Sequence, residues 1–290
     1  MTIRTDLTNE EYHALPDCIG SSGLRLMMRS PAHYWAAYID PEREPREATP
    51  AQMLGTAWHT LVFEPEAFPA RYAVVPEGLD RRTKEGKQLF ADIEASGKHP
   101  LKPDDAVKVQ RMASAARAHP VSQLIFDVAG GMAEATIIVT DPETGVPIRV
   151  RPDYMLSPGT CEEFPDGVIV DGKSTMDGAP AEFGRSSWGY GYHIQAALYI
   201  DAYMLEYGTT TPPAFLFLAQ EKDPPFVATY YAATEAQIKE GRRLYREQLP
   251  RYAKCLERNR WPAYGRGIMP LETPPWVRLD DDDSDAVITA

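Results

Sequence analysis

The sequence predicts an α/β domain in which a central mixed sheet of about five strands is flanked by helices. The first 120 residues are mostly helical in pattern, although residues 1–50 are rich in turns. Three β-rich segments follow, and a helix, two strands and a long helix complete the order. No repeat or long linker divides the 290 residues. We therefore expect a single domain over residues 1–279, with a mostly helical part at 1–120 and the catalytic core of sheet and helices at 121–262.

Apolar spacing and start signals place four helices in the first part. The first begins at Ser21 and is expected to end in a turn containing Pro31, because proline lacks the amide that a helix interior needs. Thr49 and Pro50 form an N-cap and first-turn pair for the second helix. The other two helices are expected over residues 83–95 and 103–118.

The β-rich segments begin with a predicted hairpin. Residues 135–139 and 146–156 flank the turn Asp141–Gly145, whose Asp, Pro and Gly residues favour chain reversal. Residues 167–173 form a short apolar strand that suits a central position, and residues 157–166 form an enlarged loop before it.

The last part alternates helix and strand. The remaining expected elements are a helix over roughly 189–207, strands at 214–220 and 226–232, and a long final helix. Thr234 and Gln237 provide a capping box for that final helix. Pro250 is expected to kink or divide it.

The composition excludes several classes of protein. A hydrophobic content of 43% rules out global disorder, and no apolar stretch approaches the ~20 residues that span a bilayer. The first 17 residues contain no apolar run, so we expect no signal peptide and no membrane partner. Three widely separated cysteines indicate a reducing, cytoplasmic location without disulfides or a zinc site.

The charge is strongly acidic, at −12. This argues against nucleic-acid binding through net charge alone, although local basic surfaces stay possible. Part of the excess lies in the acidic tail 280–290, which we expect to be a disordered, solvated end. Three basic clusters are candidates for phosphate contacts or for solvated helix faces: Arg25 and Arg29; Arg81, Arg82, Lys84 and Lys87; and Arg242, Arg243 and Arg246.

Two acids and a lysine form the pattern with the most specific chemistry. Asp153, after Pro152, stands late in one expected strand, and Asp171-Gly172-Lys173 ends the next. Neighbouring strands lie ~4.8 Å apart, so the two carboxylates would converge on one metal ion. Carboxylate oxygens suit Mg²⁺, and Lys173, on the face of Asp171, would stabilise charge in phosphodiester hydrolysis. The alternative is a surface hairpin with solvated charges.

Further residues extend this pattern in a fixed order. The series is G-x-x-x-H at Gly55–His59, P-D at Pro152-Asp153, D-x-K at Asp171–Lys173 and Q-x-x-x-Y at Gln195–Tyr199. It resembles the RecB-like branch of the PD-(D/E)xK nuclease superfamily. Other segments resemble phage RecE-type exonucleases (exonuclease VIII) across residues 7–262: Ser21–Leu24, Ser30–Tyr34, Leu54–His59, Arg151–Asp153, Tyr192–Tyr199 and Glu221–Pro225.

The resemblance implies a restriction-endonuclease-like core and a metal-dependent 5′→3′ double-stranded DNA exonuclease. Such an enzyme leaves 3′ single-stranded overhangs for phage-type homologous recombination. It also implies Mg²⁺, with Mn²⁺ as a substitute and two ions per site. The implied partners are double-stranded DNA ends, a single-strand annealing protein of RecT type and further copies in a ring-like homo-oligomer. The implied location is the host cytoplasm for a phage-encoded protein.

The resemblance also assigns roles to residues. Asp153 and Asp171 are the implied metal ligands, with Lys173 as the catalytic lysine. The other implied contributors to the metal site are His59, Glu134 and the carbonyl of Gly172, and the implied positioning residues are Gln195 and Tyr199.

Two other functions stay open at this stage. One is an endonuclease of restriction or repair type on the same fold, because the motifs are shared. The other is a catalytically silent DNA-binding scaffold, against which the intact Asp153, Asp171 and Lys173 speak.

Overall fold

The computed structural model describes residues 3–44, 49–265, 267–274 and 277. Its centre is a five-stranded sheet in the order β3-β6-β7-β8-β9. The strands are β3 (Met132–Ala133), β6 (Tyr154–Leu156), β7 (Val168–Thr175), β8 (Ala214–Glu221) and β9 (Ala228–Ala232). β7 and β8 run parallel and the other neighbours antiparallel. The mixed five-stranded sheet of the predicted α/β class is therefore confirmed.

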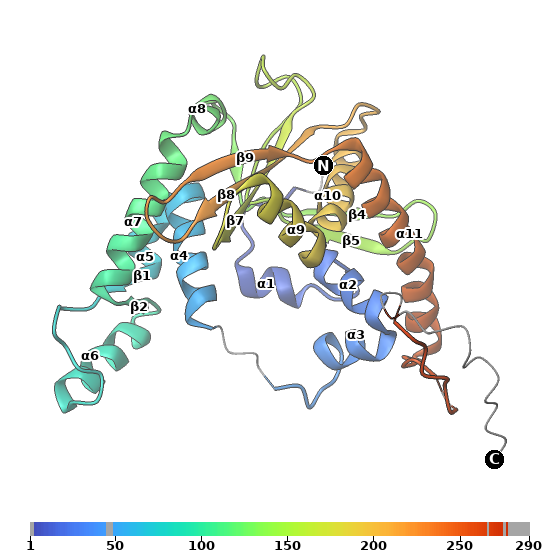
Figure 1. The fold of residues 1–290 in the computed structure, drawn as a ribbon, viewed down its shortest axis with the longest axis horizontal. Helices are drawn as coiled ribbons and strands as arrows, with labels where there is room; N and C mark the ends of the chain where they lie inside the picture. The colour runs from blue at the N-terminus through green and yellow to red at the C-terminus, as the bar shows by residue number, and fades with distance from the viewer. Residues whose placement is uncertain (1–2, 45–48, 266, 275–276, 278–290) are drawn as a thin grey trace.

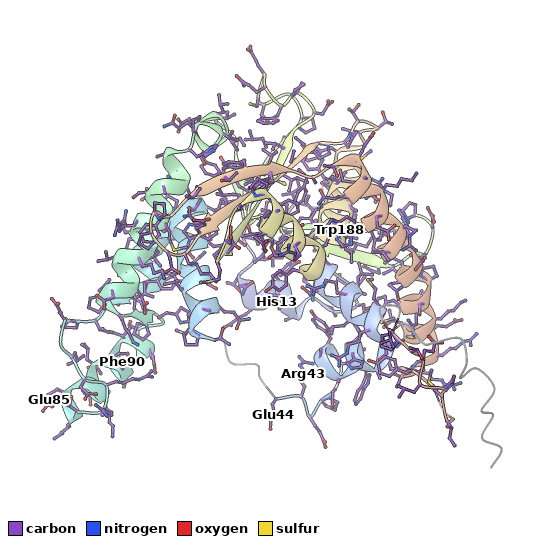
Figure 2. All side chains as sticks on the ribbon, viewed as in Figure 1. His13, Arg43, Glu44, Glu85, Phe90 and Trp188 are labelled. Carbon is purple, nitrogen blue, oxygen red and sulfur yellow. The ribbon has the colours of Figure 1, made fainter. Side chains whose placement is uncertain are left out.

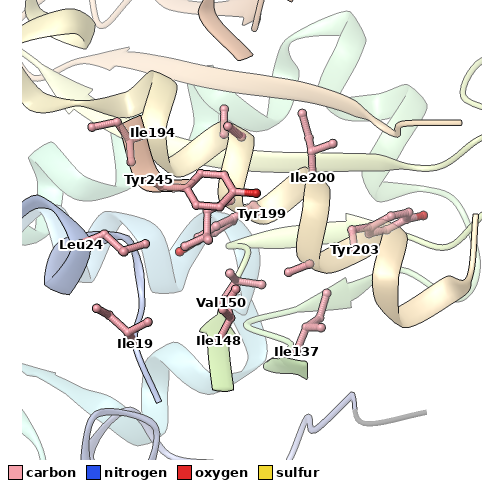
Figure 3. Packing of buried hydrophobic residues seen from close by; sticks show 14 of the residues in the cluster. Ile19, Leu24, Ile137, Ile148, Val150, Ile194, Tyr199, Ile200, Tyr203 and Tyr245 are labelled. Atoms are coloured by element: carbon pink, nitrogen blue, oxygen red, sulfur yellow. The ribbon is translucent and has the colours of Figure 1, made fainter. Parts of the chain in front are cut away.

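Helices cover both faces of this sheet (Figure 1). Those on one face are α2 (Ser21–Arg29), α10 (Tyr192–Tyr207) and α11 (Glu235–Arg258); those on the other are α4 (Pro50–Phe63), α7 (Pro103–Ala118) and α8 (Pro120–Phe126). Successive residues of a strand face opposite sides. Accordingly Ile169 of β7 packs with α10 and α11, whereas Val168 and Val170 pack with α4 and α7. Figure 3 shows part of the first of these cores, which includes Leu24, Tyr199 and Tyr245.

The remaining elements lie around this framework. They are α1 (Asn9–Ala14), α3 (Pro31–Tyr38), η1 (Pro65–Ala67), α5 (Phe68–Arg71), β1 (Tyr72–Val74), α6 (Lys84–Ala95), β2 (His99–Leu101), β4 (Ile137–Thr140), β5 (Pro147–Val150) and α9 (Pro180–Tyr190). β1 and β2 form a small parallel pair. The helices predicted at 83–95 and 103–118 are confirmed as α6 and α7. Within the described ranges, no helix is both long and apolar enough to cross a membrane.

The hairpin prediction is confirmed in one half and wrong in the other. β4 and β5 pair antiparallel around the expected turn, but as a separate two-stranded sheet. The strand predicted over 146–156 breaks at Pro152, because proline cannot donate to a strand ladder. Its second part is β6, which joins the central sheet. Asp153 therefore lies in the break before β6, and Asp171 lies inside β7 rather than at its end.

Three helix boundaries also differ from the predictions. Pro31 does not end α2 but begins α3, where Ser30 caps the new helix by accepting from the amide of His33. The helix expected over roughly 189–207 is α10, which begins at Tyr192; Gly191, in the left-handed region at φ 70°, separates it from α9, which was not predicted. α11 continues through Pro250 without division. The acidic tail lies outside the described residues.

Gly241 offers a test of how α11 packs on α10. A Cβ atom at this position would lie 2.0 Å from the carbonyl oxygen of His193, a backbone atom that cannot rotate away. We expect Gly241→Ala to lower the free energy of unfolding by about 1–3 kcal/mol, measured by urea denaturation. Gly184→Ala is the control: nothing lies within 4 Å of its added Cβ. It should stabilise α9 by about 0.5–1 kcal/mol. Equal effects of the two changes would contradict this packing.

Candidate active site

The site begins where α4 crosses β7 at Gly172. A Cβ atom there would lie 2.9 Å from Cε2 of Phe63 and 3.0 Å from Cη2 of Trp58. Glycine thus lets the helix approach the strand closely. On that helix, Nδ1 of His59 lies 3.3 Å from Oδ2 of Asp153. The same carboxylate oxygen accepts the amide of Gly172 at 2.6 Å. Asp153, although on a loop, is therefore held between helix and strand.

The opposite face of β7 carries Asp171 and Lys173. The Asp171 side chain is only 2% exposed, and its Oδ1 accepts from Nε2 of Gln195 at 2.6 Å. The ammonium of Lys173 lies against Oδ2 of Asp171 and donates to Oε1 of Gln195 at 3.1 Å. Gln195 thus binds both partners of the ion pair. The predicted roles of these residues stay predictions, but the structure places their side chains together.

The charges at this site perturb one another strongly. Burial raises the pKa of Asp171 to about 6 even though Lys173 opposes the shift. Burial and the charge of Asp153 raise the pKa of Glu134 to about 8. Asp153 behaves oppositely: burial alone would raise its pKa, but His59, Lys173 and the amide of Gly172 lower it overall. Such opposed shifts in one cluster of acids are typical of functional sites.

Two other predicted residues border this cluster. Glu134 follows β3 with φ at 50°, in the left-handed region, and its amide donates to the carbonyl of Asp153 at 3.2 Å. A non-glycine residue rarely adopts this conformation without tertiary constraint. Tyr199 lies one helical turn after Gln195 and is buried, which raises its pKa well above the usual value.

The donor set fits a hard divalent cation. Asp171 Oδ2 is buried and accepts no hydrogen bond of normal geometry, although Lys173 lies against it. Carboxylate oxygens of this kind suit Mg²⁺ or Mn²⁺. No three His, Cys, Asp or Glu side chains of the described chain stand in a ligating arrangement. The physical reason is that Asp153 and Asp171 turn toward internal donors, Gly172 and Gln195.

Two cavities flank the acids, and α1 contributes to both. One, of about 280 Å³, is lined by Lys173, Gln195 and Tyr199 together with residues of α1 and α2. The other, of about 620 Å³, is lined by His59, Glu134 and the start of α1. Nη1 of Arg149 holds α1 in place by donating to the carbonyls of Tyr12, His13 and Leu15 at 2.6–3.2 Å. α1 therefore bridges the two openings to the site.

The three basic clusters have different environments. On α11, Arg242 pairs with Asp201, Arg243 with Glu240 and Glu247, and Arg246 with Asp141. Arg81 and Arg82 pair with Glu94 and Asp80. Arg25 forms no ion pair with residues in the described ranges and lines the 280 Å³ cavity. Of the clusters, the one on α2 therefore best suits phosphate binding.

Sequence reasoning missed three contributors to the site. α1 was not expected, yet Thr8 and Glu11 form a capping box that signals its start. Arg149 carried no local signal, and Tyr192 begins the resembling segment Tyr192–Tyr199 but was given no role. The ring of Tyr192 lies 4.6 Å from Nζ of Lys173, an arrangement that depends on packing between α10 and β7.

We expect the metal-free protein to lose stability as pH rises from about 5 to 8. The pKa values of Asp171 and Glu134 are raised from 3.8 to about 6 and from 4.5 to about 8. The folded protein therefore keeps protons that the unfolded chain has released, so deprotonation favours unfolding. His59, beside Glu134, adds to this effect. Burial and the charge of Lys173 lower the pKa of His59, but Asp153 and Glu134 together raise it more, so the net shift is upward. Deprotonation of His59 therefore also favours unfolding.

Urea unfolding in EDTA at several pH values measures this effect. Each pKa unit corresponds to about 1.4 kcal/mol. Glu134→Gln removes the group with the larger shift and should flatten the decline. A stability that rises between pH 5 and 8 would contradict the buried, protonated state of these acids.

A family model and one solved structure agree with this fold. The family model "PDDEXK-like domain of unknown function (DUF3799)" matches residues 20–269. A crystal structure from Eubacterium rectale, described as a "putative exonuclease", is 14% identical with a TM-score of 0.55, covering 92% of this chain and 97% of its own. SSO0001 is 13% identical with a TM-score of 0.32, covering 81% of this chain and 75% of its own. No curated protein matches. The first structure supports the fold alone.

Proposed function

The chain belongs to the family of PDDEXK-like domains, and on this premise we propose that it is a nuclease, specifically a metal-dependent 5′→3′ exonuclease of double-stranded DNA. The observation that carries the proposal is the convergence of Asp153, Asp171 and Lys173 around β7. Gln195 joins the last two directly. A scaffold that only binds DNA has no need of a buried acid whose pKa is raised beside a fixed ammonium.

The residues divide the chemistry between them. Asp153 and Asp171 would hold Mg²⁺ or Mn²⁺, with His59 and Glu134 beside them. When bound, such an ion would polarise a phosphate oxygen of the DNA and activate a water molecule. The ammonium of Lys173, held by Gln195, is placed to stabilise charge that develops on the attacked phosphate. Gln195 keeps both Asp171 and Lys173 in position, as catalysis by preorganised groups requires.

The 280 Å³ cavity favours action at a DNA end. Lys173 lies on its wall, and Ser21, Ser22 and Arg25 line it at the start of α2. Backbone amides at a helix start, together with a guanidinium, suit a terminal phosphate. A 5′ phosphate bound there would place the first phosphodiester bonds beside Lys173, which supports the proposed polarity.

The test compares linear with covalently closed circular duplex in Mg²⁺. An exonuclease shortens the linear DNA and leaves the circle intact, and release of a 5′ end label before a 3′ label establishes polarity. Nicked or linearised circles would point to an endonuclease. Binding of DNA without any cleavage in Mg²⁺ or Mn²⁺ would favour the scaffold.

We also propose a ring-like homo-oligomer that works beside a single-strand annealing protein of RecT type. A net charge of −12 and the ion pairs of Arg242, Arg243 and Arg246 imply weak attraction for DNA, so a closed ring would help to retain it. Particle mass in solution tests the ring, and a strict monomer at micromolar concentration would count against it.

A further inference from the structure

Three aromatic rings form a stacked column beside the catalytic lysine. Tyr190, at the end of α9, stacks on Tyr192 with ring centroids 5.7 Å apart and planes inclined by 23°. Tyr192 stacks in turn on Phe217 of β8, at 5.7 Å and 28°. Phe217 is buried in the core, whereas Tyr190 is 58% exposed. The column therefore runs from the hydrophobic core to solvent and supports an aromatic ring at its outer end.

The column is tied to the catalytic centre by Lys173. Its Nζ lies 4.6 Å from the centre of the Tyr192 ring, a cation–π contact, while it also lies against Asp171. The ammonium proposed to meet the attacked phosphate is thus also packed on the middle ring of the column. A group stacked on Tyr190 would be separated by that one ring from Tyr192, on which the lysine packs.

Tyr190 and Tyr192 also stand between two cavities. Both line the 280 Å³ cavity that contains Lys173 and Gln195. Both also line a second cavity of about 260 Å³, formed with the end of β7, Ser186 of α9 and Lys222. A strand that passes from one cavity to the other would cross these two rings, with Lys222 available to its backbone.

We propose that Tyr190 is the outer face of a nucleobase-stacking subsite for the DNA strand that is cleaved. This inference rests on the proposed function and names a contact that determines which DNA ends are accepted. Every base has a π face, so such a platform binds bases without reading sequence. A base inside a duplex is covered on both faces by its neighbours, and a base of the terminal pair on one face, whereas an unpaired base at the end is free to turn onto the ring. Ends that melt readily are therefore expected to be preferred substrates.

The experiment measures binding without turnover, using the full-length protein in Ca²⁺. The probe is a linear duplex with 2-aminopurine near its 5′ end, because the fluorescence of this base is quenched when it stacks. Wild type should quench the probe, and more strongly at a frayed end than at a G·C-clamped end. Tyr190→Ala should abolish the quenching and weaken binding about 5- to 150-fold, the range found for loss of one base–aromatic stack. Tyr190→Phe keeps the ring and should retain both properties.

Trp188→Ala is the matched control. Trp188 lies on the same helix α9 (Figure 2) and is similarly exposed, at 47%. Its ring lies 4.2 Å from that of His193, tilted by 39°, and it lines neither cavity. Its removal should leave quenching and affinity unchanged. An equal effect of Trp188→Ala and Tyr190→Ala would show a general loss of α9 structure and overturn the assignment of Tyr190.

The outcomes separate this inference from the proposed function. If wild type digests linear duplex but Tyr190→Ala quenches and binds like wild type, the stacking subsite is wrong and the exonuclease stands. If wild type neither binds nor digests DNA ends in Mg²⁺, the proposed function fails and the subsite fails with it.

Discussion

Replacing Lys173 with alanine is expected to slow digestion of a linear duplex about 10²- to 10³-fold, or ~3–4 kcal/mol in the activation barrier. The side chain is 18% exposed, lies against Asp171 and is held by Gln195. An ammonium fixed in this way acts on charge in the transition state without having to reorganise. The loss should therefore appear in the single-turnover rate more than in DNA affinity.

The measurement combines rapid single-turnover digestion with calorimetric titration of Mn²⁺. Both carboxylates remain in Lys173→Ala, so metal binding should persist. Lys254→Ala removes an exposed lysine on α11, outside the three basic clusters, and is the control for a simple change of net charge. If Lys173→Ala digests at nearly the wild-type rate, the lysine is a structural partner of Asp171 only.

Local signals predicted most of the elements, because capping and apolar spacing act within a few residues. Thr49 with Pro50 and Thr234 with Gln237 began helices as expected. The same kind of signal at Thr8 and Glu11 was present but not used, and so α1 was missed. Of the kink or division expected at Pro250, the division does not occur, because the proline stands within α11. A helix packed along its length, as α11 is on α10, tolerates the loss of one hydrogen bond.

Long-range pairing was harder to predict. The position of Asp153 depends on which sheet each half of residues 146–156 joins, and a local pattern does not contain that choice. Proline at 152 indicated a break, yet its consequence is visible only when β6 pairs with β7. Likewise Gln195 and Tyr199 were expected on one helix face, but the bonds from Gln195 to Asp171 and Lys173 require the packing of α10 on β7.

The geometry of the acids explains why function and stability oppose each other here. Asp171 is buried with a raised pKa, so its charged form destabilises the metal-free protein at pH 8. Asp153 is held in its charged form by His59 and Gly172. A divalent cation bound between them would offset the repulsion that the two carboxylates exert on each other. Replacing Asp171 with a neutral residue is therefore expected to remove metal binding while leaving the stability of the metal-free protein nearly unchanged.

Asp171→Asn is accordingly expected to weaken Mn²⁺ binding at least 10²-fold and to abolish detectable digestion. Loss of a group that merely supports a ligand already costs about 10- to 100-fold in metal affinity, so loss of a ligand should cost more. In EDTA at pH 8, however, the melting temperature should change little, because two effects oppose each other. The neutral amide removes a carboxylate whose charge burial disfavours, but it leaves the ammonium of Lys173 without its ion-pair partner.

Calorimetry with Mn²⁺, digestion assays and thermal melts on one preparation measure all three quantities. Asp92→Asn, which changes an exposed acid of α6, is the control for the lost charge and should behave like wild type. Asp153→Asn should also lose metal, but it leaves His59 without its carboxylate partner at 3.3 Å and should lower the melting temperature. If Asp171→Asn binds Mn²⁺ as tightly as wild type does, the metal is held elsewhere and the assignment of this carboxylate is wrong.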